Sequence, residues 1–526
     1  MIESGVSGGP TLDNGDRFGR SCVGIGDLDG DGIPDAVVGA RSDDDGGVDA
    51  GAIYVLFLRR DGSVRASQKV SALTGGLPAG LLDAGDFFGY SVASVGDVDG
   101  DGVQDLVVGA PNDDDAGNNT GAAYVLNLFP NGTVKAASKI GNLGGGLAGM
   151  LSTGDSMGQA AGALGDFDGD GVPDVVMGAP GDDDGGNARG AIWILLLNAQ
   201  GSAHTVAKIS STTGGFGAGL ANGDGFGGRH AIAIGDVDGD GRSEIGVGAY
   251  HDAGLGGVDR GALWILSVSA NLTVTNKQKI TEQQGGFTSS LSDGDLFGMT
   301  VAPIGDVDFD GVPDIVVGNN RDDDGGQDQG ALFFFLLNTD LTVKAQRKVS
   351  DTIGGFPLSL RVGERFGRAL GFVGDLRGDG TTTIIVGAGA GVGGGAVYLL
   401  SFASLAGDVD GVPVIGGGSQ ALTIDAGPDQ AGKIFYVAGS LSGTTPGITF
   451  GNVLVPLNPD AYTAAPGLVM GYLGVLDAEG KSSASFTLPA GLSPSLVGIT
   501  LHHAFVTFGT TQLFDFASNA VSVTLQ

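Results

Sequence analysis

Six Asp-rich loops recur along the chain, and their side chains could bind a hard cation. They read GDLDGDGIPD, GDVDGDGVQD, GDFDGDGVPD, GDVDGDGRSE, GDVDFDGVPD and GDLRGDGTTT, and they begin at residues 26, 96, 165, 235, 305 and 374. If the Asp after the first Gly is position 1, carboxylates stand at positions 1, 3, 5 and 9 in five copies. Several oxygen ligands of this kind suit a cation such as Ca²⁺. Because the loop returns every 69 or 70 residues, it belongs to a repeated structural unit.

The second repeat shows best which elements position the loop. Residues 90–96 alternate in polarity and predict a first strand, which the Asp loop follows. Residues 106–111, 121–128 and 133–140 predict three more strands, separated by an acidic turn and by a Pro-Asn-Gly turn. Four short antiparallel strands per unit describe a propeller blade, and no segment shows a convincing helical period.

Composition narrows the class of protein. The net charge is −34, and only five of the 60 acidic residues are Glu. Such a bias towards Asp favours turns and metal-binding loops. The acidity argues against nucleic acid or an anionic membrane as a partner, since both attract basic patches. No apolar run reaches the ~20 residues of a membrane helix, and no signal peptide is visible at the start. The single cysteine, Cys22, falls on a strand and is expected to be buried and inert.

Further motifs carry a resemblance to a known family. Phe-Gly opens five units, at residues 18, 88, 226, 297 and 366, and Met157-Gly158 opens the third. Gly-Ala-Pro ends the second strand at 109–111 and 178–180, with looser versions elsewhere. This pattern resembles the FG-GAP repeat of the integrin α-subunit propeller over roughly residues 1–400. The resemblance implies a calcium-stabilised, extracellular propeller used in adhesion. The family has seven blades of nearer sixty residues, so we expect six blades here, with a seventh, degenerate blade as the alternative.

In that family the side chains at positions 1, 3, 5 and 9 and the carbonyl at position 7 bind calcium. The resemblance therefore implies five sites, whose ligands are Asp27, Asp29, Asp31, Ile33 and Asp35; Asp97, Asp99, Asp101, Val103 and Asp105; Asp166, Asp168, Asp170, Val172 and Asp174; Asp236, Asp238, Asp240, Arg242 and Glu244; and Asp306, Asp308, Asp310, Val312 and Asp314. Without a cation the carboxylates would repel one another. The alternative is an Asx-rich turn without metal. The sixth loop, at Asp375, is expected to be empty because Arg377 and Thr383 replace two ligands.

Two more acidic sets belong to other turns of the repeat. Asp triplets follow the second strand at 43–45, 113–115, 182–184 and 322–324, and single acids precede the first strand at 16, 86, 155, 224, 295 and 364. Because strands alternate in direction, both sets are expected on the face opposite the cation loops. In the resembled family that face binds ligands. We expect the triplets to be exposed charges that attract cationic partners and contribute little to folding; plain solvation is the alternative.

The repeat stops after Leu400. Residues 401–415 are expected to complete the last blade, because little of an outer strand precedes Phe18, and an uncompleted edge could pair with another chain. From about residue 420 alternating apolar residues predict a small β-sandwich, with strands near 422–424, 433–439, 453–457, 484–488, 496–508 and 520–525. The expected domains are thus a propeller over 1–415 and a sandwich over 420–526.

The functional hypothesis is a secreted or surface-displayed calcium-binding propeller that recognises a protein or glycan on its acidic face. One alternative is a structural subunit of an extracellular assembly, which self-associates through a blade edge or the C-terminal module. Another is an enzyme on a propeller scaffold. We expect no catalytic activity, because no convergent His, Tyr or Arg set is visible, and Trp193 and Trp264 fall at core strand positions.

Overall fold

The structure is a computed structural model of the 526-residue chain. It describes all residues except 309, 355–358, 378–380, 390–394, 403–404, 408–410, 427–429, 445–446, 451–452, 461, 463–468, 471–472, 479, 509–513 and 519. The chain divides into two compact units. The first comprises Met1–Gly305, Pro313–Leu376 and Thr383–Leu400, and the second comprises Asp306–Val312, Arg377–Thr382 and Ser401–Gln526.

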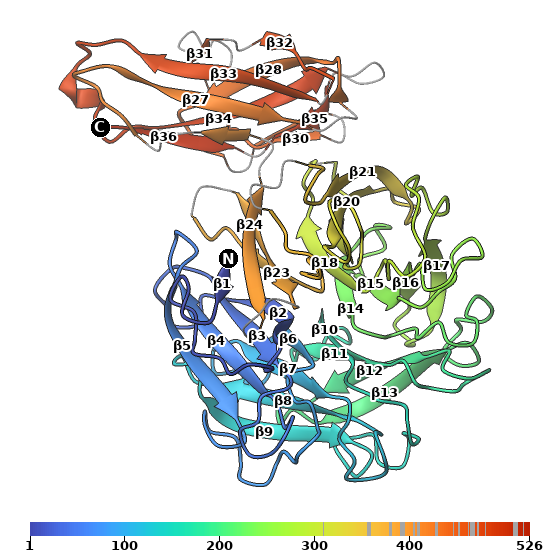
Figure 1. Ribbon diagram of the computed structural model, residues 1–526. Coiled ribbons are helices and arrows are strands. Elements are labelled where there is room, and N and C mark those ends of the chain that lie inside the picture. The colour runs from blue at the N-terminus through green and yellow to red at the C-terminus, as the bar shows by residue number, and fades with distance from the viewer. Residues whose placement is uncertain are drawn as a thin grey trace. The chain divides into compact units, whose positions relative to one another are not determined.

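Six four-stranded antiparallel sheets form the blades of a propeller (Figure 1). The first three blades are β2 (Phe18–Gly26), β3 (Asp35–Ala40), β4 (Ala52–Leu58) and β5 (Val64–Ser71); β6 (Ser91–Gly96), β7 (Asp105–Ala110), β8 (Ala122–Leu128) and β9 (Val134–Gly141); and β10 (Ala160–Gly165), β11 (Asp174–Ala179), β12 (Ala191–Leu197) and β13 (Ala203–Ser210). The next three are β14 (Ala231–Gly235), β15 (Glu244–Ala249), β16 (Ala262–Val268) and β17 (Val274–Ile280); β18 (Thr300–Gly305), β19 (Asp314–Asn319), β20 (Ala331–Leu337) and β21 (Val343–Val349); and β22 (Ala369–Gly374), β23 (Thr382–Ala388), β24 (Ala396–Phe402) and β1 (Ile2–Glu3). The prediction of six blades is confirmed.

The two middle strands of each blade are apolar on both faces because they are covered by neighbouring blades. Every residue of β3 and β4 is buried, and the same holds for β7 and β8. Trp193 and Trp264 lie in this core and Cys22 is buried, as predicted. Sandwiching between blades explains why these strands read as continuous hydrophobic runs.

The Phe-Gly motif connects each blade to the preceding blade through a backbone bridge. The Gly that precedes the third strand of a blade forms a parallel bridge with the Phe, or Met157, of the following blade. The six bridges are Gly51–Phe88, Gly121–Met157, Gly190–Phe226, Gly261–Phe297, Gly330–Phe366 and Gly395–Phe18. Gly121 has φ +81°, and a Cβ built there would lie 2.1 Å from the carbonyl oxygen of Met157. Only glycine allows this approach, and the Gly395–Phe18 bridge closes the ring.

The prediction that residues 401–415 complete the last blade is wrong. Ile2 and Glu3 of β1 pair with Val397 and Ala396 of β24, so the start of the chain supplies the fourth strand. In Figure 1 the orange strands β23 and β24 accordingly lie beside the blue N-terminus. β25 (Leu405–Gly407) pairs with β27, and β26 (Gly411–Val412) pairs with β36. Ile2 is almost fully buried, so even a two-residue strand anchors an apolar side chain in the blade.

The second unit contains two sheets that form a β-sandwich around a common apolar core, as predicted. One sheet has the order β25-β27-β33-β31, and the other β26-β36-β34-β28-β32 with β35 beside β34; β29 and β30 form a separate pair. The bounds are β27 (Gly418–Asp425), β28 (Ile434–Ser440), β29 (Ile448–Phe450), β30 (Val453–Val455), β31 (Val469–Met470), β32 (Leu473–Val475), β33 (Lys481–Leu488), β34 (Thr500–Phe508), β35 (Phe514–Ala517) and β36 (Val521–Leu525). A short 3₁₀ helix lies at Pro494–Leu496. Among the described residues no helix has the length and apolarity needed to cross a membrane.

Candidate metal centre

A break in the ladder between the first two strands of each blade positions the Asp loop. In the first blade the register shifts between Gly24 and Gly26, and Gly26 then pairs with Asp35. The same shift precedes the loop in the other blades, where the loop glycine faces the position-9 residue. Position 9 is therefore the first or second residue of a buried strand, and positions 1 to 8 project beyond the end of the sheet.

Within the loop, the carboxylates at positions 1 and 5 hold the backbone in a tight turn. Asp97 accepts hydrogen bonds from the amides of Asp101 (3.0 Å) and Gly102 (2.7 Å), and Asp101 accepts one from Val103 (2.9 Å). In the first five loops the amide of the position-7 residue donates to the position-5 carboxylate, which places Ile33, Val103, Val172, Arg242 and Val312 alike. These Asx-type bonds organise the loop whether or not a metal is bound.

The carboxylate at position 9 ties the loop to the far end of the blade's third strand. The two oxygens of Asp105 accept hydrogen bonds from Val98 (2.8 Å) and Leu128 (3.0 Å), and its side chain is fully buried. Burial, with the nearby charges of Asp99 and Asp97, raises the pKa of Asp105 to about 6. Asp35 and Asp174 make the equivalent bonds and have the pKa raised to about 6 by burial, and burial raises the pKa of Glu244 to about 7.

In at least four of the predicted loops, carboxylate oxygens of the described residues lie close enough together to contact one ion. Their possible ligand atoms lie within 4.8 Å of one another. The groups are Asp27, Asp29 and Asp35; Asp97, Asp99 and Asp101; Asp166, Asp168 and Asp174; and Asp236, Asp238 and Asp240. In the fifth loop Asp306 accepts amide hydrogen bonds from Asp310 and Gly311, and burial raises its pKa to about 6.

Unpaired oxygens at position 3 indicate that these loops fit a cation. The Oδ1 atoms of Asp29 and Asp99 are buried and accept no hydrogen bond. A buried carboxylate oxygen without a partner carries a desolvation cost that a bound cation would offset. The donor set, carboxylates with a nearby backbone carbonyl, is of the kind that Ca²⁺ prefers.

A basic side chain from the outer strand already contacts two carboxylates of the loop. Lys135 Nζ lies 2.8 Å from Asp99 and 2.6 Å from Asp101. Arg65 contacts Asp29 and Asp31 in the same way, and His204 Nε2 lies 3.5 and 3.7 Å from Asp168 and Asp170. In the fourth blade the equivalent residue is Thr275. Arg65 and Lys135 thus partly neutralise the first two loops.

The Asp triplets do not form the exposed acidic face that the sequence suggested. Lys139 Nζ lies 2.5 Å from both Asp113 and Asp115, and Asp113 is almost fully buried and accepts a hydrogen bond from Tyr124 (2.9 Å). Lys69, Lys208 and Lys348 repeat this pairing with the triplets of three other blades, and Lys279 pairs with Asp252 at the same place in the fourth blade. The first Asp of each triplet is buried and the middle Asp is exposed, and Asp115 is exposed as well. We expected these charges to contribute little to folding because they would be exposed. The first Asp of each triplet is buried, so that reason does not hold for it.

The acids before each first strand are also internal. Asp16, Asp86, Asp155, Asp224 and Asp295 are buried, and each accepts a hydrogen bond from the amide three residues earlier. Their pKa values are raised by burial, to about 6 for Asp16, Asp86 and Asp295. The amide of Asn112 donates to the carbonyl of Asp86, so this set and the triplets share one face, as predicted.

The paired lysines were missed by the sequence reasoning, although a signal was present. Lys69, Lys139, Lys208, Lys279 and Lys348 recur with the period of the repeat. Each lies four residues after Arg65, Lys135, His204, Thr275 or Lys344. The outer strand runs from one face of the propeller to the other, so its two ends reach the cation loop and the Asp triplet respectively.

The sixth loop differs in chemistry, as its sequence indicated. Thr383 replaces the position-9 carboxylate and is fully buried. Residues 378–380 of this loop, with Asp379, lie outside the described part of the chain. The expectation that the loop at Asp375 is empty stays a prediction.

Comparison with known proteins identifies the same repeat that the sequence motifs indicate. The FG-GAP repeat family matches residues 88–126 and 158–195. Integrin alpha-PS5 of Drosophila melanogaster is 37% identical over 173 residues, covering 32% of this chain and 15% of that protein. Integrin alpha pat-2 of Caenorhabditis briggsae is 31% identical over 239 residues (44% and 18%), and integrin alpha-V of Gallus gallus is 30% identical over 252 residues (46% and 21%).

The similarity thus spans about a fifth or less of the length of these integrin chains. The two matches to the FG-GAP repeat family lie in the second and third blades, each of which contains an Asp loop. The first 400 or so residues of this chain form an integrin-α-like FG-GAP β-propeller.

Proposed function

We propose that the propeller binds calcium at five loops and acts outside the cell in adhesion or recognition of a protein or glycan. The observation that carries the calcium proposal is the pair of buried, unpaired oxygens of Asp29 and Asp99, each beside two further carboxylates. The integrin relatives support the extracellular role.

The ligands would be the side chains at positions 1, 3, 5 and 9 with the position-7 carbonyl of each loop. A bound ion would neutralise the carboxylates and fix the loop against the sheet. At a hundredfold excess over its Kd, one ion that binds only the folded protein stabilises it by about 2.7 kcal/mol. Calcium would displace Arg65 and Lys135 from the carboxylates they contact, so the loops should differ in affinity.

Calorimetric titration of chelator-treated protein with calcium tests the proposal. We expect uptake of about five ions and a rise in the melting temperature. Asp99→Asn should remove about one ion, whereas Asp61→Asn, in an exposed turn with no predicted ligand, should remove none. Absence of calcium uptake, or a melting temperature that does not change when the chelator is added, would refute calcium binding.

The recognition role has its own test. The native surface of the source cell, probed with the tagged full-length chain with and without calcium, should yield a partner that depends on calcium. A chain that binds calcium but captures the same proteins as its five-loop Asp→Asn variant would not support a role in recognition.

A further inference from the structure

Four arginines gather near the axis of this acidic propeller. Arg20 lies in β2, Arg41 follows β3, and Arg229 and Arg368 precede β14 and β22. Arg20 and Arg368 are 4% and 6% exposed, although arginine is rarely buried without a partner. They lie at the starts of inner strands or just after second strands, so they belong to the face opposite the cation loops.

These arginines lack carboxylate partners. In the described part of the chain, none of the four forms an ion pair, whereas lysines of the first five blades do. Arg20 Nε, Arg41 Nε and Arg229 Nη1 are buried donors without an acceptor, and Arg368 Nη1 donates to the carbonyl of Gly389 (3.2 Å). Burial lowers the pKa of Arg41 to about 10 and also lowers the pKa of Arg20 and Arg368, with the neighbouring arginines adding to the effect.

A tyrosine ring holds the cluster in place without neutralising it. The guanidinium carbons of Arg20, Arg229 and Arg41 lie 4.1, 5.0 and 5.4 Å from the centre of the Tyr90 ring. Cation–π contacts of this kind attract each guanidinium to the ring. Arg20 also has a side-chain hydrogen bond to Tyr90. Arg20 Nε, Arg41 Nε and Arg229 Nη1 nevertheless have no acceptor, and the positive charges remain adjacent.

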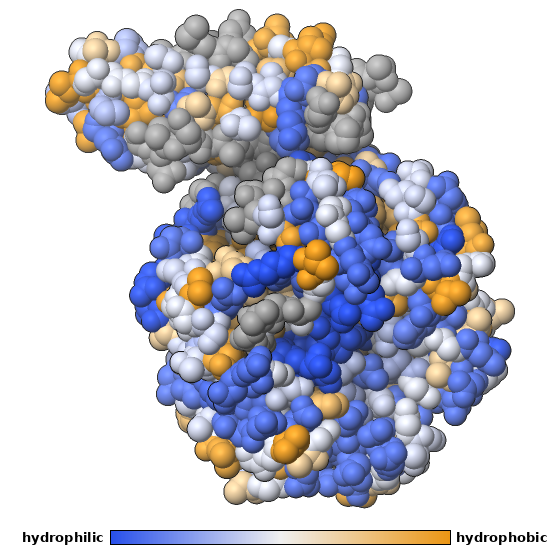
Figure 2. Space-filling view, in the orientation of Figure 1, coloured by the Kyte–Doolittle hydropathy of each residue, from blue (hydrophilic) through white to orange (hydrophobic). Residues whose placement is uncertain are grey.

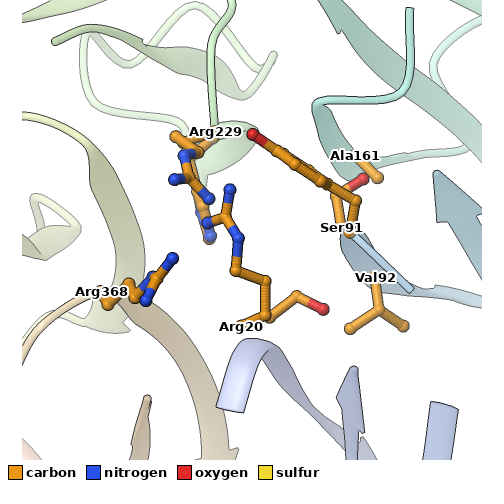
Figure 3. A pocket seen from close by; sticks show the side chains of 9 residues that line it. Arg20, Ser91, Val92, Ala161, Arg229 and Arg368 are labelled. Atoms are coloured by element: carbon orange, nitrogen blue, oxygen red, sulfur yellow. The ribbon is translucent and has the colours of Figure 1, made fainter. Parts of the chain in front are cut away.

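The guanidinium groups point into a narrow cavity. Figure 3 shows Arg20, Arg229 and Arg368 directing their heads into the same space, with Ser91, Val92 and Ala161 on its wall. Figure 2 shows strongly hydrophilic residues gathered in the middle of the propeller. The cavity has room for roughly one water-sized group, so an entering ligand could place only a small group there.

We propose that Arg20, Arg229 and Arg368 form a binding site for a single carboxylate group. A carboxylate is an acceptor for unpaired N–H donors, and one of its oxygens matches the water-sized space between the guanidinium groups, whereas a phosphate or sulfate is larger. The group could belong to a free small acid or to an acidic side chain of a partner. The site uses residues of the propeller alone and does not depend on calcium binding.

The test measures the melting temperature of the full chain in calcium, at constant ionic strength, as sodium chloride is replaced by sodium acetate or sodium phosphate. Acetate should raise the melting temperature in a saturable way, and more than chloride or phosphate. Arg229 is half-buried, and Arg229→Gln should weaken acetate binding at least tenfold. Arg361→Gln, an exposed arginine, should leave it unchanged.

Arg20→Gln tests whether a lost response to acetate comes from misfolding of the variant. It removes a buried, unpaired charge, so in chloride its melting temperature should not fall, while the response to acetate should disappear. An acetate effect that is equal in all variants, or that phosphate exceeds, would overturn the proposal.

A titration separates the two sources of the carboxylate. If a short peptide with blocked termini and one Glu binds more tightly than acetate, the ligand is a partner's side chain; if acetate alone binds, it is a free acid. Binding of neither probe overturns the site.

Discussion

Two lysines on one outer strand should have opposite effects when they are replaced. Lys135 and Lys139 both lie on β9, four residues apart, and each contacts two Asp residues. Lys139→Met should destabilise the propeller and leave calcium binding at the second loop unchanged. Lys135→Met should leave stability nearly unchanged in the absence of calcium and tighten calcium binding at that loop.

The magnitudes follow from burial. The Asp113 side chain is 5% exposed, and removing one partner of a fully buried pair costs about 3–5 kcal/mol. Because the Lys139 side chain is 24% exposed, water screens part of its charge, and we expect about 2–3 kcal/mol. Asp99 and Asp101, the partners of Lys135, are 17% and 28% exposed, and Lys135 itself is 35% exposed, so water screens this pair and its loss should change stability little.

Thermal unfolding in chelator and calorimetric titration with calcium measure the two effects separately. Lys139→Met combined with Asp113→Asn should recover part of the lost stability, because the uncompensated buried charge is then removed. If the two single variants have the same melting temperature, or if Lys139→Met alters calcium affinity as much as Lys135→Met does, the acidic residues do not divide into a structural set at the triplets and a metal-binding set at the loops.

Three more perturbations test other parts of the structure. Gly121→Ala should destabilise the propeller by about 2–5 kcal/mol, from ~1–2 kcal/mol of left-handed strain and ~1–3 kcal/mol of overpacking against Met157. Gly154 has φ +90° and open space around it, so Gly154→Ala should cost only the strain; equal melting temperatures for the two variants would contradict the bridge. In chelator the melting temperature should rise as the pH falls from 7 to 5, because the raised pKa values of Asp16, Asp86 and Asp295 (about 6) make the folded state bind protons more tightly. The stability gained by protonation is complete below about pH 3.8 and is lost as the pH rises through 6. Asp86→Asn should flatten this dependence of the melting temperature on pH, which calorimetry measures. Ile2→Asp should detach β1, lower the melting temperature and expose the edge of β24, so light scattering should detect association between chains; a stable monomer would show that β1 is dispensable.

The repeat made much of this structure predictable from sequence. The spacing of the Asp loops and the alternation in residues 90–96 determine blade number, strand order and the face on which each loop lies. Physical causes explain the rest. β1 contributes only two residues, too few for a periodic signal, so its pairing with β24 could not be inferred locally. The burial of Asp113 depends on Lys139 and Tyr124, which the sequence separates from it by 26 and 11 residues. Arg20 and Arg229 come together only because the ring closes.

The β1–β24 pair has a mechanical consequence. Ile2 pairs with Val397 and Glu3 with Ala396 in antiparallel register, so the chain leaves this pair at the same end through Met1 and through Tyr398. A force that pulls these two exits apart loads the hydrogen bonds one after another, as in unzipping, instead of shearing them together. The propeller should therefore yield at low tension when it is held by Met1 and by the second unit. A handle placed within a middle blade would instead meet fully paired strands and much higher resistance.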